Sequence, residues 1–241
     1  MQFDYDMALA DKLLSQYLAD NPDISVENIA YSGAFYSNTS ELSDEDAALI
    51  GVQAGYLQWR TDIYNVFNRI TFADRLMLAG YFENAIEVLD GEIGLETLND
   101  FENPCLRIIV AYVAMNNVSK ALDAAKKLQK FLCQTLPENH PLCIECLNLL
   151  IGIMYVYSND KKKGHRCLKS VSSPDGETIA KDVIRSGCCN GKSFAARICD
   201  AIDSFRTIEF PSLDVLKKHG KVQQWKKMGK RWHCYEQIDL L

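Results

Sequence analysis

The sequence has few of the residues that interrupt regular structure, with only 6 prolines and 13 glycines among 241 residues. Together with 48% hydrophobic and 24% charged residues, this excludes a collagen-like or largely disordered chain and is typical of an ordered globular protein. No stretch reaches the roughly 18 apolar residues that a bilayer-spanning helix needs. The first residues also lack a basic start followed by an apolar run, so we expect no signal peptide.

Complete catalytic and cofactor motifs are missing as well. The segment GCCNGKS at 187–193 has three residues between its glycines where a phosphate-binding loop needs four, and no apolar strand precedes it. Cys143 and Cys146 have the spacing of one metal knuckle, but zinc sites normally pair two, so we expect both to be packed. The four histidines adjoin no Ser, Cys or paired-carboxylate constellation. We therefore expect no enzyme activity, no cofactor and no metal.

Cysteine usage bears on the compartment. Nine cysteines, an odd number, are scattered through apolar segments rather than clustered in a short loop-rich frame. Such a distribution favours reduced thiols over a disulfide framework. We expect a cytoplasmic protein, with the nucleus as the other possibility.

The net charge of −6 hides an uneven distribution along the chain. Residues 1–50 hold ten acidic residues and the single base Lys12, whereas residues 215–235 hold seven bases and no acid. The two ends could attract each other across the fold, or each could address a separate partner.

Apolar residues recur mostly at three- and four-residue spacing, the period of an α-helix. Turn and capping residues separate the periodic segments, for example Ser43 before DEDAALI. We predict an all-α protein with helices at 5–19, 43–68, 70–79, 82–93, 104–115, 118–134, 141–158, 160–171, 176–187, 191–206 and 212–232.

Three of the predicted helix pairs share one spacing pattern, with small residues early in the helices and larger residues between them. Small residues let two antiparallel helices approach, and the larger ones fill the seam. The pattern places LLIGIMYVYSNDKKKGHRCL at 149–168 in a helical hairpin whose lysines are solvated, rather than in a strand and phosphate loop. The three series are Phe72, Ala73, Leu76, Gly80, Phe82, Ala85 and Leu89; Ile108, Ile109, Tyr112, Asn116, Val118, Ala121 and Ala125; and Ile151, Gly152, Tyr155, Asn159, Lys161, Gly164 and Leu168.

This pattern resembles the tetratricopeptide repeat over about 69–171. The segments FADRLMLAGYFENAIEVL, IIVAYVAMNNVSKALDAA and IGIMYVYSNDKKKGHRCL look like its small-residue hairpin. The chain departs from the family where Ile109 replaces a small residue and where the period lengthens around TLPENHP. The resemblance implies a superhelical array of stacked pairs with capping helices at both ends. We expect a helical-repeat domain over 1–211, followed by a basic helix and tail over 212–241.

In such arrays the first helices of successive pairs line a concave face, where a partner helix or peptide usually lies. Because the residues placed there are almost all apolar, the hollow must be covered, either by the chain's own helices or by another protein. The predicted groove consists of Phe67, Ile70, Met77, Leu106, Val110, Val113, Leu149, Ile153, Val156 and Tyr157.

The basic C-terminal segment is the second candidate site. Trp225, Met228 and Trp232 form an apolar stripe among basic residues, which fits a capping helix or docking on an acidic partner, RNA or an anionic membrane surface. The sequence pI of 5.3 argues against nucleic acid as the main ligand. The basic residues are Lys217, Lys218, Lys221, Lys226, Lys227, Lys230 and Arg231.

A weaker resemblance connects ELSDEDAALIGVQ, Trp59-Arg60 and ENHPLCIECLNLL with 14-3-3 proteins. It implies phosphopeptide binding, although the paired arginine and tyrosine of that family are absent and only Arg60 could contribute. Our leading expectation is a non-enzymatic scaffold or adaptor, or a fixed subunit of a complex. We expect it to hold a partner helix or peptide segment in its apolar groove. The oligomeric state and the identity of the partner do not follow from the sequence.

Overall fold

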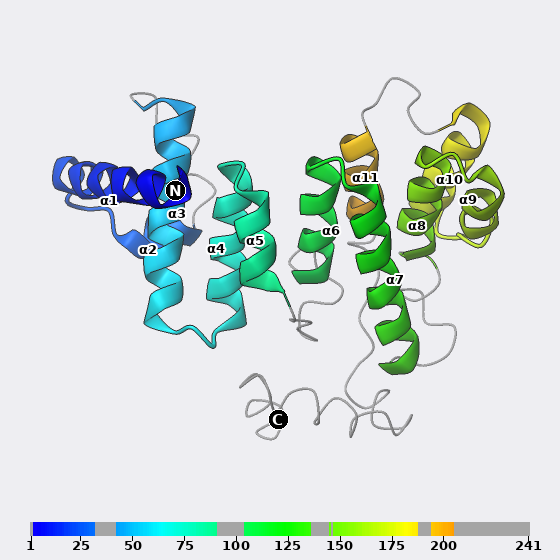
Figure 1. Ribbon diagram of the computed structural model, residues 1–241, viewed down its shortest axis with the longest axis horizontal. Coiled ribbons are helices and arrows are strands. Elements are labelled where there is room, and N and C mark those ends of the chain that lie inside the picture. Colours follow the sequence, from blue (N-terminus) through cyan, green and yellow to red (C-terminus); the bar gives the residue numbers. More distant parts are fainter. Residues whose placement is uncertain are drawn as a thin grey trace. The chain divides into compact units, whose positions relative to one another are not determined.

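The computed structural model describes residues 2–31, 42–90, 104–135, 145, 147–187 and 194–204, and the regular elements in these ranges are all helices (Figure 1). The predicted all-helical class is therefore confirmed. The chain divides into two compact units, Met1–Asp90 and Gly91–Leu241, where the sequence led us to expect one repeat domain over 1–211. The predicted boundary at 211 and the predicted helix at 212–232 lie outside the described residues.

Unit 1 contains five described helices: α1 (Gln2–Asp20), α2 (Val26–Tyr31), α3 (Asp44–Thr61), α4 (Val66–Leu78) and α5 (Phe82–Leu89). Helix α3 is the centre of the unit, because α1, α2 and α4 all pack against it, while α5 packs on α4. A continuous core joins the first three helices through Leu14, Ile29, Ala30, Ala47, Ile50 and Ala54.

A buried arginine ties α4 to the end of α2. Arg75 is 7% exposed, and its Nε and Nη2 donate hydrogen bonds of 3.0 and 2.7 Å to the carbonyl oxygen of Ala30. That carbonyl lies in the last turn of α2, where backbone oxygens lack partners within the helix. Asn68, which is on α4 like Arg75, accepts a hydrogen bond from the hydroxyl of Tyr31, the last residue of α2. The two contacts hold the six-residue α2 in place.

The predicted helix at 43–68 is wrong, because the chain turns between Thr61 and Val66 and starts a second helix. Asp62 leaves the helical conformation and its carboxylate accepts from the backbone N–H of Tyr64 at 3.0 Å. The Asn65 side chain then accepts from the backbone N–H groups of Phe67 and Asn68, which caps α4. Short polar side chains that bond to nearby backbone compete with helix in this way.

Helix α2 is absent from the predicted set because six residues are too few for a periodicity signal. Its start carries a reciprocal cap: the Ser25 backbone N–H donates to Asn28 Oδ1, and the Asn28 N–H donates to Ser25 Oγ, both at 3.1 Å. Serine followed three residues later by a side chain that can reach back is the relevant sequence signal.

Unit 2 contains six described helices: α6 (Pro104–Ala114), α7 (Val118–Thr135), α8 (Leu147–Tyr157), α9 (Lys161–Leu168), α10 (Pro174–Ser186) and α11 (Phe194–Asp203). Helix α8 is apolar except for Asn148 and is the centre of the unit, with α7, α9, α10 and α11 packed on it. Leu149, Leu150, Ile153 and Met154 are fully buried. A helix that is hydrophobic all round is stable only when surrounded.

The three predicted hairpin turns have the same backbone conformation. Gly80, Asn116 and Asn159, which align in the sequence pattern, all have positive φ, at 84°, 56° and 65°. In each turn the next residue donates back to a carbonyl five residues earlier, as in the bond from Tyr81 N to Leu76 O at 2.8 Å. This is the Schellman end of a helix, which needs a glycine or asparagine at that position. The hairpins α4–α5, α6–α7 and α8–α9 are thus confirmed.

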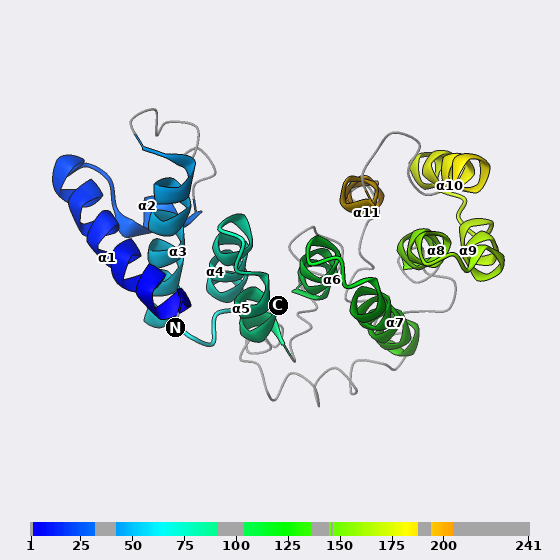
Figure 2. The ribbon, with the colours of Figure 1, turned by 45° about the horizontal axis from the view of Figure 1, so that its top comes forward.

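The small residues of the pattern lie where helices approach most closely. A Cβ atom added to Gly152 on α8 would lie 2.7 Å from Leu168 Cγ, and one added to Gly164 on α9 would lie 2.9 Å from the Gly152 carbonyl oxygen. Figures 1 and 2 show α8 and α9 side by side. Their contact is therefore close enough to exclude even a methyl group.

Candidate functional site

The predicted groove is covered in unit 2 by the chain itself. Helix α11 packs on α6 and α8, the two first helices of the predicted pairs. Its apolar side chains share one core with five of the predicted groove residues, and Val110 packs against the same core. A partner could reach these residues only after α11 left. The five are Leu106, Val113, Leu149, Ile153 and Val156, none more than 8% exposed.

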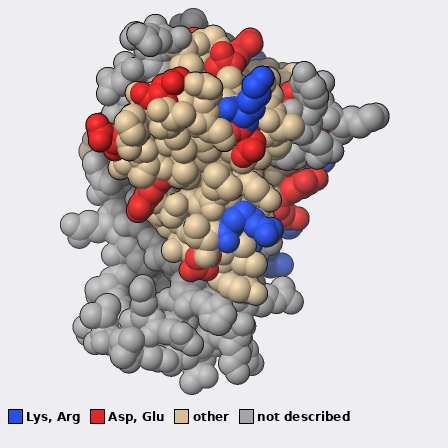
Figure 3. Space-filling view, turned by 90° about the vertical axis from the view of Figure 1, so that its left-hand side faces the viewer, with Lys and Arg blue, Asp and Glu red and all other residues tan. Residues whose placement is uncertain are grey.

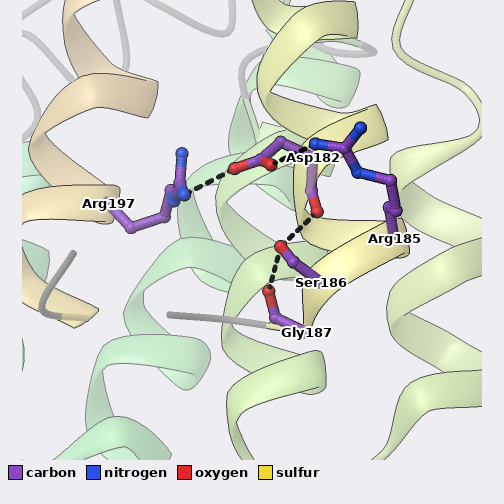
Figure 4. Close-up of polar contacts among 5 residues, drawn as sticks. All are labelled: Asp182, Arg185, Ser186, Gly187 and Arg197. Carbon is purple, nitrogen blue, oxygen red and sulfur yellow. Dashed lines mark hydrogen bonds and ion pairs between the residues drawn. The ribbon is translucent and has the colours of Figure 1, made fainter. Parts of the chain in front are cut away.

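Two contacts fasten α11 in this position. The ring of Phe194 stacks on Tyr157 with centroids 4.0 Å apart, although Tyr157 remains 40% exposed. Arg197, whose side chain is 7% exposed, forms an ion pair with Asp182 on α10 at 2.6 Å (Figure 4). Asp182 also meets the exposed Arg185 at 3.4 Å. The buried guanidinium thus depends on the Asp182 carboxylate, which joins α10 to α11.

We expect Asp182→Asn to destabilise unit 2 by about 2 kcal/mol, since it leaves the buried charge of Arg197 without its anion. Hydrogen exchange should show the loss first as weaker amide protection in α11 than in α7. Arg185→Gln is the matched control, because Arg185 is 80% exposed and its removal should change stability by no more than about 0.5 kcal/mol. Equal effects of both variants would contradict this assignment.

The predicted groove residues of unit 1 are placed differently from one another. Phe67 is 49% exposed at the start of α4 and its ring lies 5.4 Å from that of Tyr31. Ile70 is buried at 2% exposure, and Met77 is half-buried. The structure does not gather these three into one open face. The basic residues Lys217 to Arg231 lie outside the described residues.

Unit 1 contains a cavity of about 660 Å³ that the sequence did not predict. We call it the aromatic pocket. It opens among four helices, and its lining comprises Met7 and Ala8 of α1, Gln53, Tyr56 and Trp59 of α3, Arg69, Phe72 and Leu76 of α4, and Asn84, Glu87 and Val88 of α5.

Three rings form one wall of the pocket. Trp59 and Phe72 are stacked with centroids 5.4 Å apart and an angle of 14° between the rings. Tyr56 lies 5.6 Å from Phe72 and 6.1 Å from Trp59 in tilted arrangements. Tyr56 and Trp59 are three residues apart on α3, so they share a helix face, and Phe72 meets them from α4. The wall provides a rigid apolar surface of large area.

Polar atoms at the pocket lack full pairing. Gln53 is 6% exposed and its Nε2 donates to Asp11 at 2.9 Å, but its Oε1 has no hydrogen-bond partner within the described part of the chain. The indole N–H of Trp59 is likewise buried without a partner there. Each such group costs about 1–3 kcal/mol of folding free energy. Burial lowers the pKa of Arg69.

A hydrogen bond joins α1 to the turn between α4 and α5. The Tyr81 hydroxyl, in the turn between α4 and α5, donates to the Asp6 carboxylate on α1 at 2.6 Å. Burial, the hydrogen bond and the charge of Asp6 together raise the pKa of Tyr81 to about 12. Tyr81 therefore stays a donor at neutral pH and holds α1 against the α4–α5 turn.

The described residues do not gather three or more His, Cys, Asp or Glu side chains in a position to hold a metal ion. None of the helices in the described ranges is long and apolar enough to cross a membrane. What unit 1 does offer is a cavity whose size lies in the range of ligand sites, lined by aromatic side chains and a few polar groups.

The sequence reasoning missed this pocket because its residues come from four helices whose packing no local pattern specifies. The available signal was the pair Tyr56 and Trp59, two large aromatic residues three positions apart on one helix. That pair alone does not separate a core contact from a cavity wall.

No protein-family model, no curated protein and no solved structure matches the chain.

Proposed function

We propose that the protein is a non-enzymatic interaction module whose aromatic pocket receives a large apolar side chain from a helix or peptide of a partner protein. The observation that carries the proposal is the pocket itself, with its stacked wall of Trp59 and Phe72. In protein interfaces a few residues, often aromatic, contribute most of the binding free energy, and they lie in well-packed, desolvated pockets near the centre.

The negative charge of unit 1 favours a partner segment that is basic and amphipathic. Residues 1–90 contain 15 acidic and 4 basic residues, a formal net charge of −11. Acidic side chains predominate over basic ones on the face of unit 1 in Figure 3. An acidic surface around an apolar pocket attracts lysine and arginine residues that flank an apolar anchor.

The same charge disfavours a 14-3-3-like role for unit 1. A phosphopeptide would have to approach Arg60, which is exposed, through the negative field of the 15 acidic residues. Binding of RNA or a membrane surface through the basic C-terminal residues stays a prediction, since those residues lie outside the described ranges.

A tetratricopeptide-like stacking of the hairpins is part of the proposal. It is supported by the repeated turn geometry at Gly80, Asn116 and Asn159 and by the close approach at Gly152 and Gly164. We also propose a cytoplasmic or nuclear location, supported by three cysteines of the described residues that form no disulfide, Cys133, Cys167 and Cys199.

Filling the pocket tests the function. Ala8→Phe should place a ring in the pocket and weaken binding about 10- to 100-fold, because the partner's anchor loses its apolar burial. The probe is a fluorescein-labelled amphipathic Leu–Lys peptide with one central Phe, and the readout is fluorescence anisotropy. Leu9→Phe is the matched control, since Leu9 is the next residue on α1, is 36% exposed and does not line the pocket.

The proposal requires saturable binding by the wild-type chain that persists in moderate salt and survives Leu9→Phe. If the wild-type chain does not bind, or if both variants bind as it does, the pocket is not a partner site. Circular dichroism of both variants checks that α1 stays folded.

A further inference from the structure

Unit 2 carries a second, separate surface at the contact of α7, α8 and α9. The ammonium of Lys126 on α7 lies 5.1 Å from the ring centroid of Tyr155 on α8, and the ammonium of Lys163 on α9 lies 5.5 Å from the same centroid. We call Lys126, Tyr155 and Lys163 the lysine–tyrosine seam. Two cations from different helices therefore converge on one ring.

The surroundings of the seam are strongly basic. Helix α7 has four bases and one acid, and residues 161–169 have five bases and no acid; all nine bases are exposed. Lys130 lies one helical turn after Lys126. Arg166 and Lys126 both act on the pKa of Cys167, which burial raises and these two charges lower. Arg166 therefore lies beside the seam.

Little of this charge is balanced by carboxylates of the described residues. Asp160, which caps α9, pairs with Lys163 at 2.8 Å. Over the described part of the chain, no carboxylate lies within ion-pair distance of Lys126, whose contact is the Tyr155 ring. Like charges gathered at one place repel each other, and a bound anion relieves that repulsion. The seam is arranged for a negatively charged ligand.

The surroundings of the Tyr155 ring indicate which class of anionic partner fits the seam. Proteins that bind single-stranded nucleic acid present exposed aromatic faces on which bases stack. Tyr155 is half-buried and lysine side chains occupy positions over its ring. Stacked bases therefore fit this surface poorly, whereas the carboxylates of a protein segment need only the lysine charges.

Farther along the same helices, about one to two helical turns from the seam, is a chain of polar groups that suits a peptide backbone. Gln129 Nε2 donates to Asn148 Oδ1 at 2.8 Å, and Asn148 Nδ2 donates to Ser170 Oγ at 2.9 Å. Gln129 and Asn148 belong to α7 and α8, and Ser170 lies in the turn directly after α9, so the groups come from the elements that form the seam. Each amide has a second N–H with which it can meet a peptide carbonyl.

We propose that the lysine–tyrosine seam binds an acidic, Asp- or Glu-rich segment of a partner protein. The proposal concerns unit 2 alone and does not depend on the aromatic pocket of unit 1. The lysine–tyrosine seam and the aromatic pocket differ in charge and in chemistry, so we expect each to bind a different kind of partner.

A labelled poly-glutamate peptide is the probe, with an oligodeoxythymidine and phosphatidylserine vesicles as the competing anions. At low salt the full chain should bind poly-glutamate saturably, and Lys126→Gln combined with Lys163→Gln should weaken binding about tenfold, because both substitutions remove charge from the site. Lys181→Gln on α10 is the control, since Lys181 is 70% exposed and pairs with Glu177. It should leave the affinity unchanged.

The double variant should keep the helical circular dichroism spectrum of the wild type, because both lysines are exposed. Unchanged affinity in the double variant would overturn the proposal and would assign poly-glutamate binding to other basic residues, such as those after 212. Tighter binding of the oligonucleotide or the vesicles than of poly-glutamate, or no binding of poly-glutamate, would also overturn it.

Discussion

Replacing Ile153 by Asp should unfold unit 2. Ile153 is fully buried on α8 and shares one core with α6, α9 and α11. Burying a carboxyl group in this apolar core costs several kcal/mol, a large part of the 5–15 kcal/mol by which a domain is stable. The sequence pattern places Ile153 in the predicted groove, where replacing Val110 and Ile153 together by Asp is expected to abolish partner binding while the isolated protein stays helical. Its burial predicts loss of structure instead.

Hydrogen exchange distinguishes these outcomes, because it reports protection helix by helix. Amides of α6 to α11 should lose protection in Ile153→Asp, while those of α3 and α4 keep it. Ile153→Val is the control and should cost only about 0.5–1.5 kcal/mol, since it removes one methyl group. A folded Ile153→Asp variant with wild-type protection in α8 would show that α11 does not cover this residue in solution.

Among the glycines of the described residues, Gly164 should be the one whose replacement by alanine destabilises the protein most. A Cβ atom there would lie 2.5 Å from Val156 Cγ2, 2.9 Å from the Gly152 carbonyl oxygen and 3.0 Å from the Val156 backbone nitrogen. Alanine gains about 1 kcal/mol of helix propensity over glycine, but forcing α8 and α9 apart costs more. We expect a net loss of about 2 kcal/mol in thermal or denaturant unfolding.

Gly152→Ala provides a matched test of the same contact, because its Cβ atom would meet a side chain rather than backbone. The nearest atoms are Leu168 Cγ at 2.7 Å and Cδ2 at 2.8 Å. Combining Gly152→Ala with Leu168→Ala should therefore destabilise by less than the sum of the single effects, with a coupling of about 1 kcal/mol or more. Leu168→Ala should not rescue Gly164→Ala. Additive effects in the first pair would mean that the helices are farther apart than described.

Local patterns accounted for the hairpins because each feature depends on neighbouring residues. Asn116 and Asn159 stand where a helix must end in a left-handed residue, and Gly80 stands at the third such place. The turn at Asp62 to Asn65 was missed although its capping chemistry is equally local, because the apolar period continues across it. Where the apolar periodicity and the capping residues indicate different boundaries, the hydrogen bonds of the cap determine where the helix ends.

The groove shows the limit of such reasoning. Periodicity placed Leu149, Ile153 and Val156 on one face of a helix, and the structure buries all three. Nothing in that pattern states which surface covers the face. Helix α11 comes from almost fifty residues farther along the chain, fastened by Arg197 to Asp182 and by Phe194 to Tyr157.

The sequence by itself determined that the chain is helical, where three of its hairpins turn, and which small residues let α8 and α9 touch. These properties follow from backbone sterics and side-chain spacing within about a dozen residues. Only the tertiary structure decided that α11 covers the predicted groove residues of α6 and α8, that four helices leave the aromatic pocket, and that Lys126 and Lys163 meet over Tyr155. Those arrangements depend on contacts between distant segments, whose free energies no single stretch of residues contains.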